Sequence, residues 1–163
     1  ENFDCKLICS EKCAAKLANS RSVRPLFLSF ILEENDRANG TNLLVEFKEN
    51  YIVKTYIADL TYSDEFHYSW QNHKLYFKEI LGHSVGSSFI MLDEKYVFTG
   101  DSLLEKYPVI VSFPQGNKNA FLRETIPLFE RCFLPDMIIL PGHGKPFELS
   151  ELMEGGKIHV EIR

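Results

Sequence analysis

Leu81-Gly82-His83-Ser84-Val85-Gly86-Ser87 places a histidine between glycines at the end of a predicted β-strand, Lys74 to Leu81. Glycine permits the tight turns and close backbone approach that a ligand-binding or metal-binding loop requires. A histidine held in such a loop is a candidate metal ligand. His83 is therefore the first residue on which a functional prediction depends.

Two further strand ends present a ligand in the same way. Val97-Phe98-Thr99-Gly100-Asp101 closes an apolar strand with a carboxylate, a common place for an active-site acid in α/β proteins. Ile138-Ile139-Leu140-Pro141-Gly142-His143-Gly144 closes another with a histidine framed by glycines. Histidine nitrogen and carboxylate oxygen together suit zinc, iron or manganese. Each turn alone is a weak signal, but together they predict a metal site.

With these three motifs the sequence resembles the metallo-β-lactamase-fold hydrolases. Gly82 to Ser87 is similar to the family's Gly-His-Ser/Thr-x-Gly-Ser motif, Phe98 to Asp101 to its Phe-Thr-Gly-Asp motif, and Leu140 to Gly144 to its closing Pro-Gly-His-Gly motif. The resemblance extends from about Cys5 to Leu152. It implies an α/β (α+β) fold: the second half of an αββα sandwich, with a mixed β-sheet and flanking helices.

The resemblance also implies roles for single residues. His83 would complete the first metal site, Asp101 would bridge two metals at the catalytic centre, and His143 would belong to the second site. The cofactor would be zinc, one or two ions, with iron or manganese as alternatives. In intact members a metal-bound hydroxide attacks an ester, thioester, amide or phosphoester bond of a small-molecule substrate.

One part of the family's pattern is absent. The main ligand cluster, His-x-His-x-Asp-His, precedes the three motifs in the family, and no His-x-His occurs in these 163 residues. His67 and His73 have neither its spacing nor its place, because they follow Cys5 to Leu17, which is similar to the strand and helix after the cluster. The sequence also begins at Glu1 without a methionine, which indicates a segment cut, cleaved or left out upstream.

We therefore expect residues 1–163 to form a single partial domain, truncated in its N-terminal half. The remaining sheet would expose apolar surface. That surface would be covered by another copy of the chain in a homo-oligomer, or by association with the missing half.

Composition restricts the partners. The chain has 163 residues and a mass of 18.9 kDa, with 45% hydrophobic and 25% charged residues, which is ordinary for one globular domain. A net charge of -5 leaves no basic excess for a phosphate backbone, so no nucleic-acid partner is expected. The longest apolar run, Met137 to Leu140, is too short to span a bilayer, so no membrane partner is expected. Without a visible secretion signal, we expect a cytoplasmic protein with reduced thiols.

The cysteines offer a different interpretation. Cys5, Cys9 and Cys13 are spaced by four residues, and the chain, Cys132 included, has no C-x-x-C pair of the kind that a tight metal site usually shows. Small buried or half-buried hydrophobic residues are the simpler interpretation than a zinc-structural domain.

Two functional hypotheses stay open. The chain is the C-terminal half of a metal-dependent hydrolase, inactive or incomplete as this fragment, or it is a non-catalytic remnant or interaction module with the same fold. Asp101 stands where zinc β-lactamases typically carry cysteine, which argues against antibiotic hydrolysis. Only 20 residues follow His143, which leaves no room for the helical substrate domain of glyoxalase II.

The loop from Ser102 to Asn119 is the family's usual place for substrate contacts. Its polar and aromatic side chains could line a pocket, although solvated loop residues are the simpler interpretation: Lys106, Tyr107, Phe113 and Lys118. Other local patterns predict three helices: Glu11 to Ala18, capped by Ser10; Asn119 to Phe133, with a kink or late start at Pro127; and a short one over Phe147 to Met153. They also predict strands over Leu43 to Phe47 and Tyr51 to Ile57, and a hairpin of Ser88 to Leu92 with Tyr96 to Thr99.

Overall fold

The computed structural model describes residues 5–19, 24–50, 54–113 and 115–163. Its main element is a six-stranded sheet with the order β3-β4-β5-β6-β7-β8. The strands are β3 (Glu65–Trp70), β4 (His73–Glu79), β5 (Ser88–Leu92), β6 (Tyr96–Gly100), β7 (Ile138–Pro141) and β8 (Phe147–Glu148). Neighbouring strands are antiparallel except β6 and β7, which are parallel. The expected mixed sheet with flanking helices is confirmed, and so is the β5–β6 hairpin.

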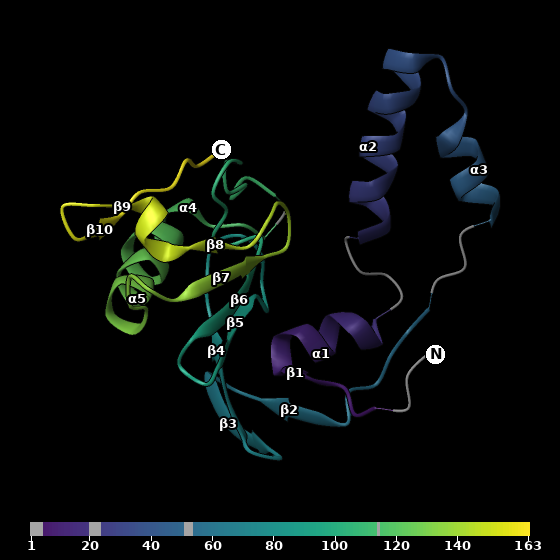
Figure 1. Cartoon of the computed structure of the whole chain (residues 1–163). Helices are drawn as coiled ribbons and strands as arrows, with labels where there is room; N and C mark the ends of the chain where they lie inside the picture. Colours follow the sequence, from purple (N-terminus) through teal and green to yellow (C-terminus); the bar gives the residue numbers. More distant parts are fainter. Residues whose placement is uncertain (1–4, 20–23, 51–53, 114) are drawn as a thin grey trace.

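A continuous helical segment packs on one face of this sheet (Figure 1). It consists of α4 (Lys118–Ala120), the π-helix η1 (Phe121–Thr125) and α5 (Ile126–Cys132). Phe89 of β5 meets Phe129 and Phe133 edge-on, with ring centroids 6.1 and 4.9 Å apart. These rings lie in the main hydrophobic core.

The predicted irregularity at Pro127 takes the form of the π-turn. Ile126 donates its N–H to the carbonyl of Phe121, five residues earlier. Pro127 has no N–H, so it cannot donate the i→i−4 hydrogen bond that would restore the regular α-helical pattern at that point. The helix therefore contains one wide turn next to the loop of His83, a local form often found near functional sites.

The opposite face of the sheet is apolar and only partly covered. Paired residues on neighbouring strands share a face, and two rows of apolar side chains cross the sheet. The rows are Phe66, Phe77, Ile90, Phe98, Leu140 and Tyr68, Leu75, Leu92, Tyr96, Ile138. Phe98 is 43% exposed and Tyr96 is 37% exposed. This surface, called the apolar sheet face below, fits the expectation that half of the sandwich leaves a sheet uncovered.

A small separate unit packs beside the main sheet. β1 (Ile8–Ser10) leads into α1 (Glu11–Ala18) and pairs in parallel with β2 (Leu60–Tyr62). Ser10 Oγ accepts a hydrogen bond from Cys13 N–H at 3.2 Å, as the sequence predicts for the helix cap. Lys12 and Lys16 then bind the main body, through Glu79 Oε2 and the carbonyl of Val85.

A helical hairpin stands away from the sheet in Figure 1. It consists of α2 (Arg24–Asn39) and α3 (Leu43–Asn50), so the strand predicted over Leu43 to Phe47 is wrong. The reason is a cap from outside that segment. Asp36 accepts hydrogen bonds from the N–H groups of Leu43 and Leu44 at 2.8 and 2.9 Å and from Thr41 Oγ1. Hydrogen bonds, from Thr41 first, lower the pKa of Asp36, so its charge also favours the helix start.

Two other local predictions need correction. The strand predicted over Tyr51 to Ile57 falls partly outside the described residues, and residues 54–58 form no strand. The predicted helix over Phe147 to Met153 is β8 followed by a 3₁₀ turn, η2 (Leu149–Leu152), and β9 (Met153–Glu154), which pairs with β10 (Lys157–Ile158). Gly155 and Gly156 both adopt positive φ and close this hairpin turn.

Within residues 5–19, 24–50, 54–113 and 115–163, no helix is both long and apolar enough to cross a membrane.

The aromatic core predicts a large mutational effect. Phe129→Ala removes a fully buried ring that stacks on Phe133 at 4.8 Å, and we expect it to lower the free energy of unfolding by about 3–5 kcal/mol. Urea denaturation followed by circular dichroism measures the change. Leu134→Ala is the control: this side chain is 59% exposed, and its loss should cost about 0.5 kcal/mol or less. Equal effects of the two substitutions would contradict the assigned core.

Candidate functional site

Three strands of the main sheet end at the same edge. β4 and β6 are each antiparallel to β5, and β7 is parallel to β6, so β4, β6 and β7 run in one direction. His83, Asp101 and His143 follow these three strands in order. The topology therefore brings the three residues predicted from sequence to one place.

The loop that contains His83, residues 81–87, lies between the helical segment and α1. Its glycines allow this: a methyl group at Gly82 would lie 2.3 Å from Phe121 Cβ, and one at Gly86 would lie 2.8 Å from the backbone nitrogen of Cys13. Asn117 N–H donates to the carbonyl of Gly82 at 2.8 Å, and Ser10 Oγ donates to the carbonyl of Gly86 at 3.3 Å. The loop is thus fixed by the helical segment on one side and by α1 on the other.

The His83 imidazole has a defined tautomer in this arrangement. Its Nδ1 lies 2.8 Å from the carbonyl oxygen of Ile110, and its ring meets Phe113 edge-on with centroids 5.4 Å apart. A carbonyl oxygen only accepts hydrogen bonds, so Nδ1 carries a proton, and in the neutral imidazole the free lone pair is on Nε2. That Nε2 lies 3.9 Å from Oδ2 of Asp101.

Asp101 joins the two histidines. Its Oδ2 faces His83, and its Oδ1 accepts a hydrogen bond from Nδ1 of His143 at 2.7 Å. Gly142 makes this contact possible, because a methyl group there would lie 2.3 Å from Oδ1 of Asp101. The His143 side chain is 71% exposed, so its ring can reorient with little loss of packing.

The donor set fits a metal ion in part. A zinc ion binds histidine nitrogen and carboxylate oxygen at about 2.0–2.2 Å, so a gap of 3.9 Å between Nε2 of His83 and Oδ2 of Asp101 can accommodate one. His143 does not add a third ligand in this arrangement, because its Nδ1 is directed at the carboxylate. Among the described residues, no group of three or more His, Cys, Asp or Glu side chains is arranged to hold an ion.

A small cavity of about 190 Å³ borders His143. Its other lining residues come from the loop after Asp101 and from the turn after β7: Glu105, Lys106, Tyr107, Gly144 and Lys145. Lys106 pairs with Glu105 at 3.1 Å. Of the loop residues weighed in the sequence, Lys106 and Tyr107 line this cavity and Phe113 contacts His83. Lys118 does neither.

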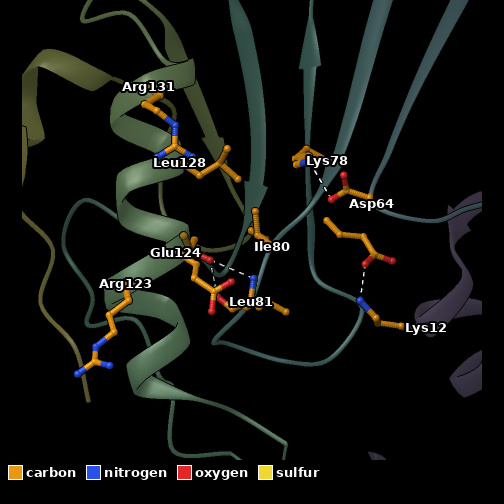
Figure 2. Close-up of a pocket in the computed structure, with 11 residues that line it drawn as sticks. Lys12, Asp64, Lys78, Ile80, Leu81, Arg123, Glu124, Leu128 and Arg131 are labelled. Carbon is orange, nitrogen blue, oxygen red and sulfur yellow. Dashed lines mark hydrogen bonds and ion pairs between the residues drawn. The ribbon is translucent and has the colours of Figure 1, made fainter.

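A larger cavity, of about 430 Å³, lies between α1, the end of β4 and the helical segment (Figure 2). Charged side chains surround an apolar floor of Ile80, Leu81 and Leu128. Two of the lysines are paired, Lys12 with Glu79 and Lys78 with Asp64. None of His83, Asp101 and His143 lines it. The smaller cavity is therefore the one that touches a residue of the three-residue site.

The cysteines lie apart from the three-residue site. Burial raises the pKa of the Cys9 thiol, and the neighbouring Cys13 raises it further. A protonated thiol is a poor metal ligand and a poor nucleophile. All four cysteines are free thiols, and Cys132 is also half-buried with its pKa raised by burial.

Sequence reasoning missed the groups that orient the ligands. The carbonyl of Ile110 fixes the His83 tautomer, and the Thr125 hydroxyl binds the end of β4. A backbone carbonyl leaves no signal in the sequence, and Thr125 lies within a helical pattern that hides its role. Lys145 had a usable signal, since it directly follows the Gly-His-Gly turn.

No protein-family model matches the chain, and no curated protein matches it. Solved structures do. The BLEG-1 B3 metallo-beta-lactamase is 18% identical over 91% of this chain and 62% of its own, with a TM-score of 0.61. A metallo-beta-lactamase family protein from Thermus thermophilus is 18% identical over 88% of this chain and 48% of its own, also with a TM-score of 0.61. An archaeal superfamily protein from Sulfolobus tokodaii is 13% identical over 91% and 56%, with a TM-score of 0.58.

The chain thus spans about half to three fifths of the length of the structures it matches. At these identities the likeness concerns the fold. It agrees with the sequence motifs, which correspond to the second half of the domain.

The packing of Gly82 predicts a steric effect on the site. Gly82→Ala places a methyl group against the backbone and ring of Phe121, so we expect it to cost about 1–3 kcal/mol more than Gly155→Ala. Gly155 has open space around it and a φ of 58°, which alanine can adopt, whereas Gly82 has a φ of 117°, so the extra cost at Gly82 combines the clash with Phe121 and a larger backbone strain. Thermal denaturation of both variants measures the difference. Equal losses would show that the His83 loop is not held by Phe121.

Proposed function

Because this chain has the C-terminal part of the metallo-β-lactamase fold, we propose that it contributes His83, Asp101 and His143 to the metal centre of a hydrolase. The observation that carries the proposal is the meeting of the three side chains at one sheet edge, with 3.9 Å between Nε2 of His83 and Oδ2 of Asp101. Since the chain spans 48–62% of the matched structures, a complete centre would use further ligands that these residues do not supply.

Each of the three residues would have a different role at the metal centre. His83 offers an unprotonated nitrogen in a fixed tautomer, and Asp101 offers an oxygen on each side of its carboxylate. His143 would either add a ligand after reorienting or keep donating a hydrogen bond from Nδ1 to Asp101. A zinc ion, with iron or manganese as alternatives, would supply an acidified water and a Lewis acid for the attack on an ester, thioester or phosphoester.

The cavity beside His143 favours a small-molecule substrate with a negative charge. Two lysines, Lys106 and Lys145, and one carboxylate, Glu105, line the cavity, so its lining carries a net positive charge. Tyr107 adds an aromatic surface for an apolar part of the substrate. We also propose a cytoplasmic, reducing location, which the four free thiols support.

A second candidate function is a non-catalytic interaction module. One observation favours it: the described residues hold no three-ligand group in a metal-binding arrangement. Under this alternative the site residues form only the hydrogen-bonded pair of Asp101 and His143 with His83 nearby.

Calorimetric titration with Zn²⁺ tests the metal proposal. We expect about one ion per chain, and an Asp101→Ala/His143→Ala double variant should weaken the affinity by more than about tenfold. His159→Ala is the matched control, because it removes an exposed imidazole that is not part of the site. Absence of binding, or binding unchanged in the double variant, would exclude the metal centre and favour the interaction module.

We further propose that the apolar sheet face mediates association, with a second copy of this chain or with the remaining half of the domain. Phe98→Lys places a charge at the centre of that face. In analytical ultracentrifugation we expect the unmodified chain to self-associate and this variant to shift to monomers. Leu134→Lys, on an exposed loop away from the face, is the control. A chain that is monomeric at all concentrations would leave association with the other half as the proposal.

A further inference from the structure

Leu81, in the segment between β4 and His83, is bound by one side chain of the helical segment. Thr125 Oγ1 accepts a hydrogen bond from Leu81 N–H at 3.0 Å and donates one to the carbonyl of Leu81 at 2.7 Å. Figure 2 shows these two contacts as dashed lines at Leu81. The hydroxyl thus satisfies both backbone groups of a residue two positions before His83, as a neighbouring strand would do.

The π-turn puts Thr125 in this place. η1 widens the helix by one residue between Phe121 and Thr125, and both of these side chains are buried against the loop. Phe121 lies against Gly82, and Thr125 binds Leu81. One turn of the helix therefore contacts two consecutive residues, Leu81 and Gly82.

The other hydrogen bonds of the loop hold its base and its far end. Ile80 N–H donates to the carbonyl of Ser87 at 2.9 Å, which closes the base of the loop. Lys16 and Ser10 hold its far end through the carbonyls of Val85 and Gly86. Between these two attachments, Thr125 binds Leu81, Phe121 and Asn117 N–H contact Gly82, and the carbonyl of Ile110 binds the His83 ring. Thr125 provides the only side-chain hydrogen bonds to Leu81 among the contacts described.

We infer that Thr125 is a positioning residue for His83: its hydroxyl fixes Leu81 and so aims the imidazole at Ile110 and Asp101. The inference rests on the proposed role of His83 as a ligand, but the orientation itself can be measured without metal. The contacts of the His83 ring allow only a small displacement of its backbone. Nδ1 of His83 must stay within hydrogen-bond distance of a carbonyl, and Nε2 must stay directed at a carboxylate 3.9 Å away.

A merely structural role for Thr125 makes a different prediction. Loss of its hydroxyl leaves Leu81 N–H and C=O without partners in a half-buried place, so stability falls under either interpretation. Only a positioning role also changes the His83 tautomer. With the loop displaced, Nδ1 loses the carbonyl of Ile110, and the proton distributes between the two ring nitrogens.

Nitrogen-15 NMR of labelled histidine rings provides the test, at about pH 8.5, where an ordinary imidazole is neutral. His83→Gln identifies the His83 signals. We expect a single Nδ1–H tautomer in the unmodified chain and in Thr125→Ser, which keeps the hydroxyl. In Thr125→Val, which keeps the shape and removes the hydroxyl, we expect the two ring signals to move toward a common averaged position.

Phe133→Leu is the matched control. Phe133 directly follows α5 and packs in the core on Phe89 and Phe129, so the substitution should lower stability and leave the His83 tautomer unchanged. If Thr125→Val does not fold, Thr125→Ala removes the same hydroxyl with less bulk and takes its place. A folded variant without the hydroxyl that keeps the single tautomer would overturn the inference.

Zn²⁺ titration of the same samples separates this inference from the proposed function. We expect Thr125→Val to bind Zn²⁺ about tenfold more weakly than the unmodified chain, and Thr125→Ser to bind normally. If no sample binds Zn²⁺, the proposed function fails while the tautomer result still decides the role of Thr125. If all samples bind equally, the positioning role fails while the metal site stands.

Discussion

The common direction of β4, β6 and β7 is the constraint on which the site depends. Strand direction decides at which sheet edge a strand ends, and these three strands are followed by His83, Asp101 and His143. β6 and β7 are neighbours, but β5 lies between β4 and β6, so the loop of His83 is not next to the loop of Asp101 in the sheet. The long loop after Asp101 spans that distance, because its Ile110 carbonyl binds His83 and its Tyr107 lies beside His143.

The sheet also supplies the physical reason for proposing association. One face is buried under the helical segment by a cluster of aromatic rings, while the apolar sheet face carries paired rows of comparable hydrophobicity with only partial cover. Water contact with such a surface is unfavourable by about 25 cal/mol per Å² of apolar area. A sequence that places apolar residues on both faces of a strand is typical of a sheet packed on both sides.

Prediction from the sequence worked where a local pattern and its tertiary surroundings agree. The Ser10 cap, the β5–β6 hairpin and the strand ends that carry His83, Asp101 and His143 all depend on nearby residues. The prediction over Leu43 to Phe47 was wrong because Asp36, in the preceding helix, supplies the cap that turns a β-prone stretch into a helix. The roles of the Ile110 carbonyl and of Thr125 were equally invisible, because each depends on a contact across the fold.

The hydrogen bond between His143 and Asp101 explains how the three predicted ligands can meet without forming a three-ligand group. An aspartate near two histidines needs a partner for its charge, and Nδ1 of His143 provides one at 2.7 Å. A cation at Oδ2 of Asp101 would partly neutralise the carboxylate and so weaken its hydrogen bond with His143, whose exposed ring is free to turn. Asp101 is therefore the residue through which the arrangement described here and a metal-bound arrangement are linked. His83, fixed by Ile110 and by the strand end, would keep its place in both.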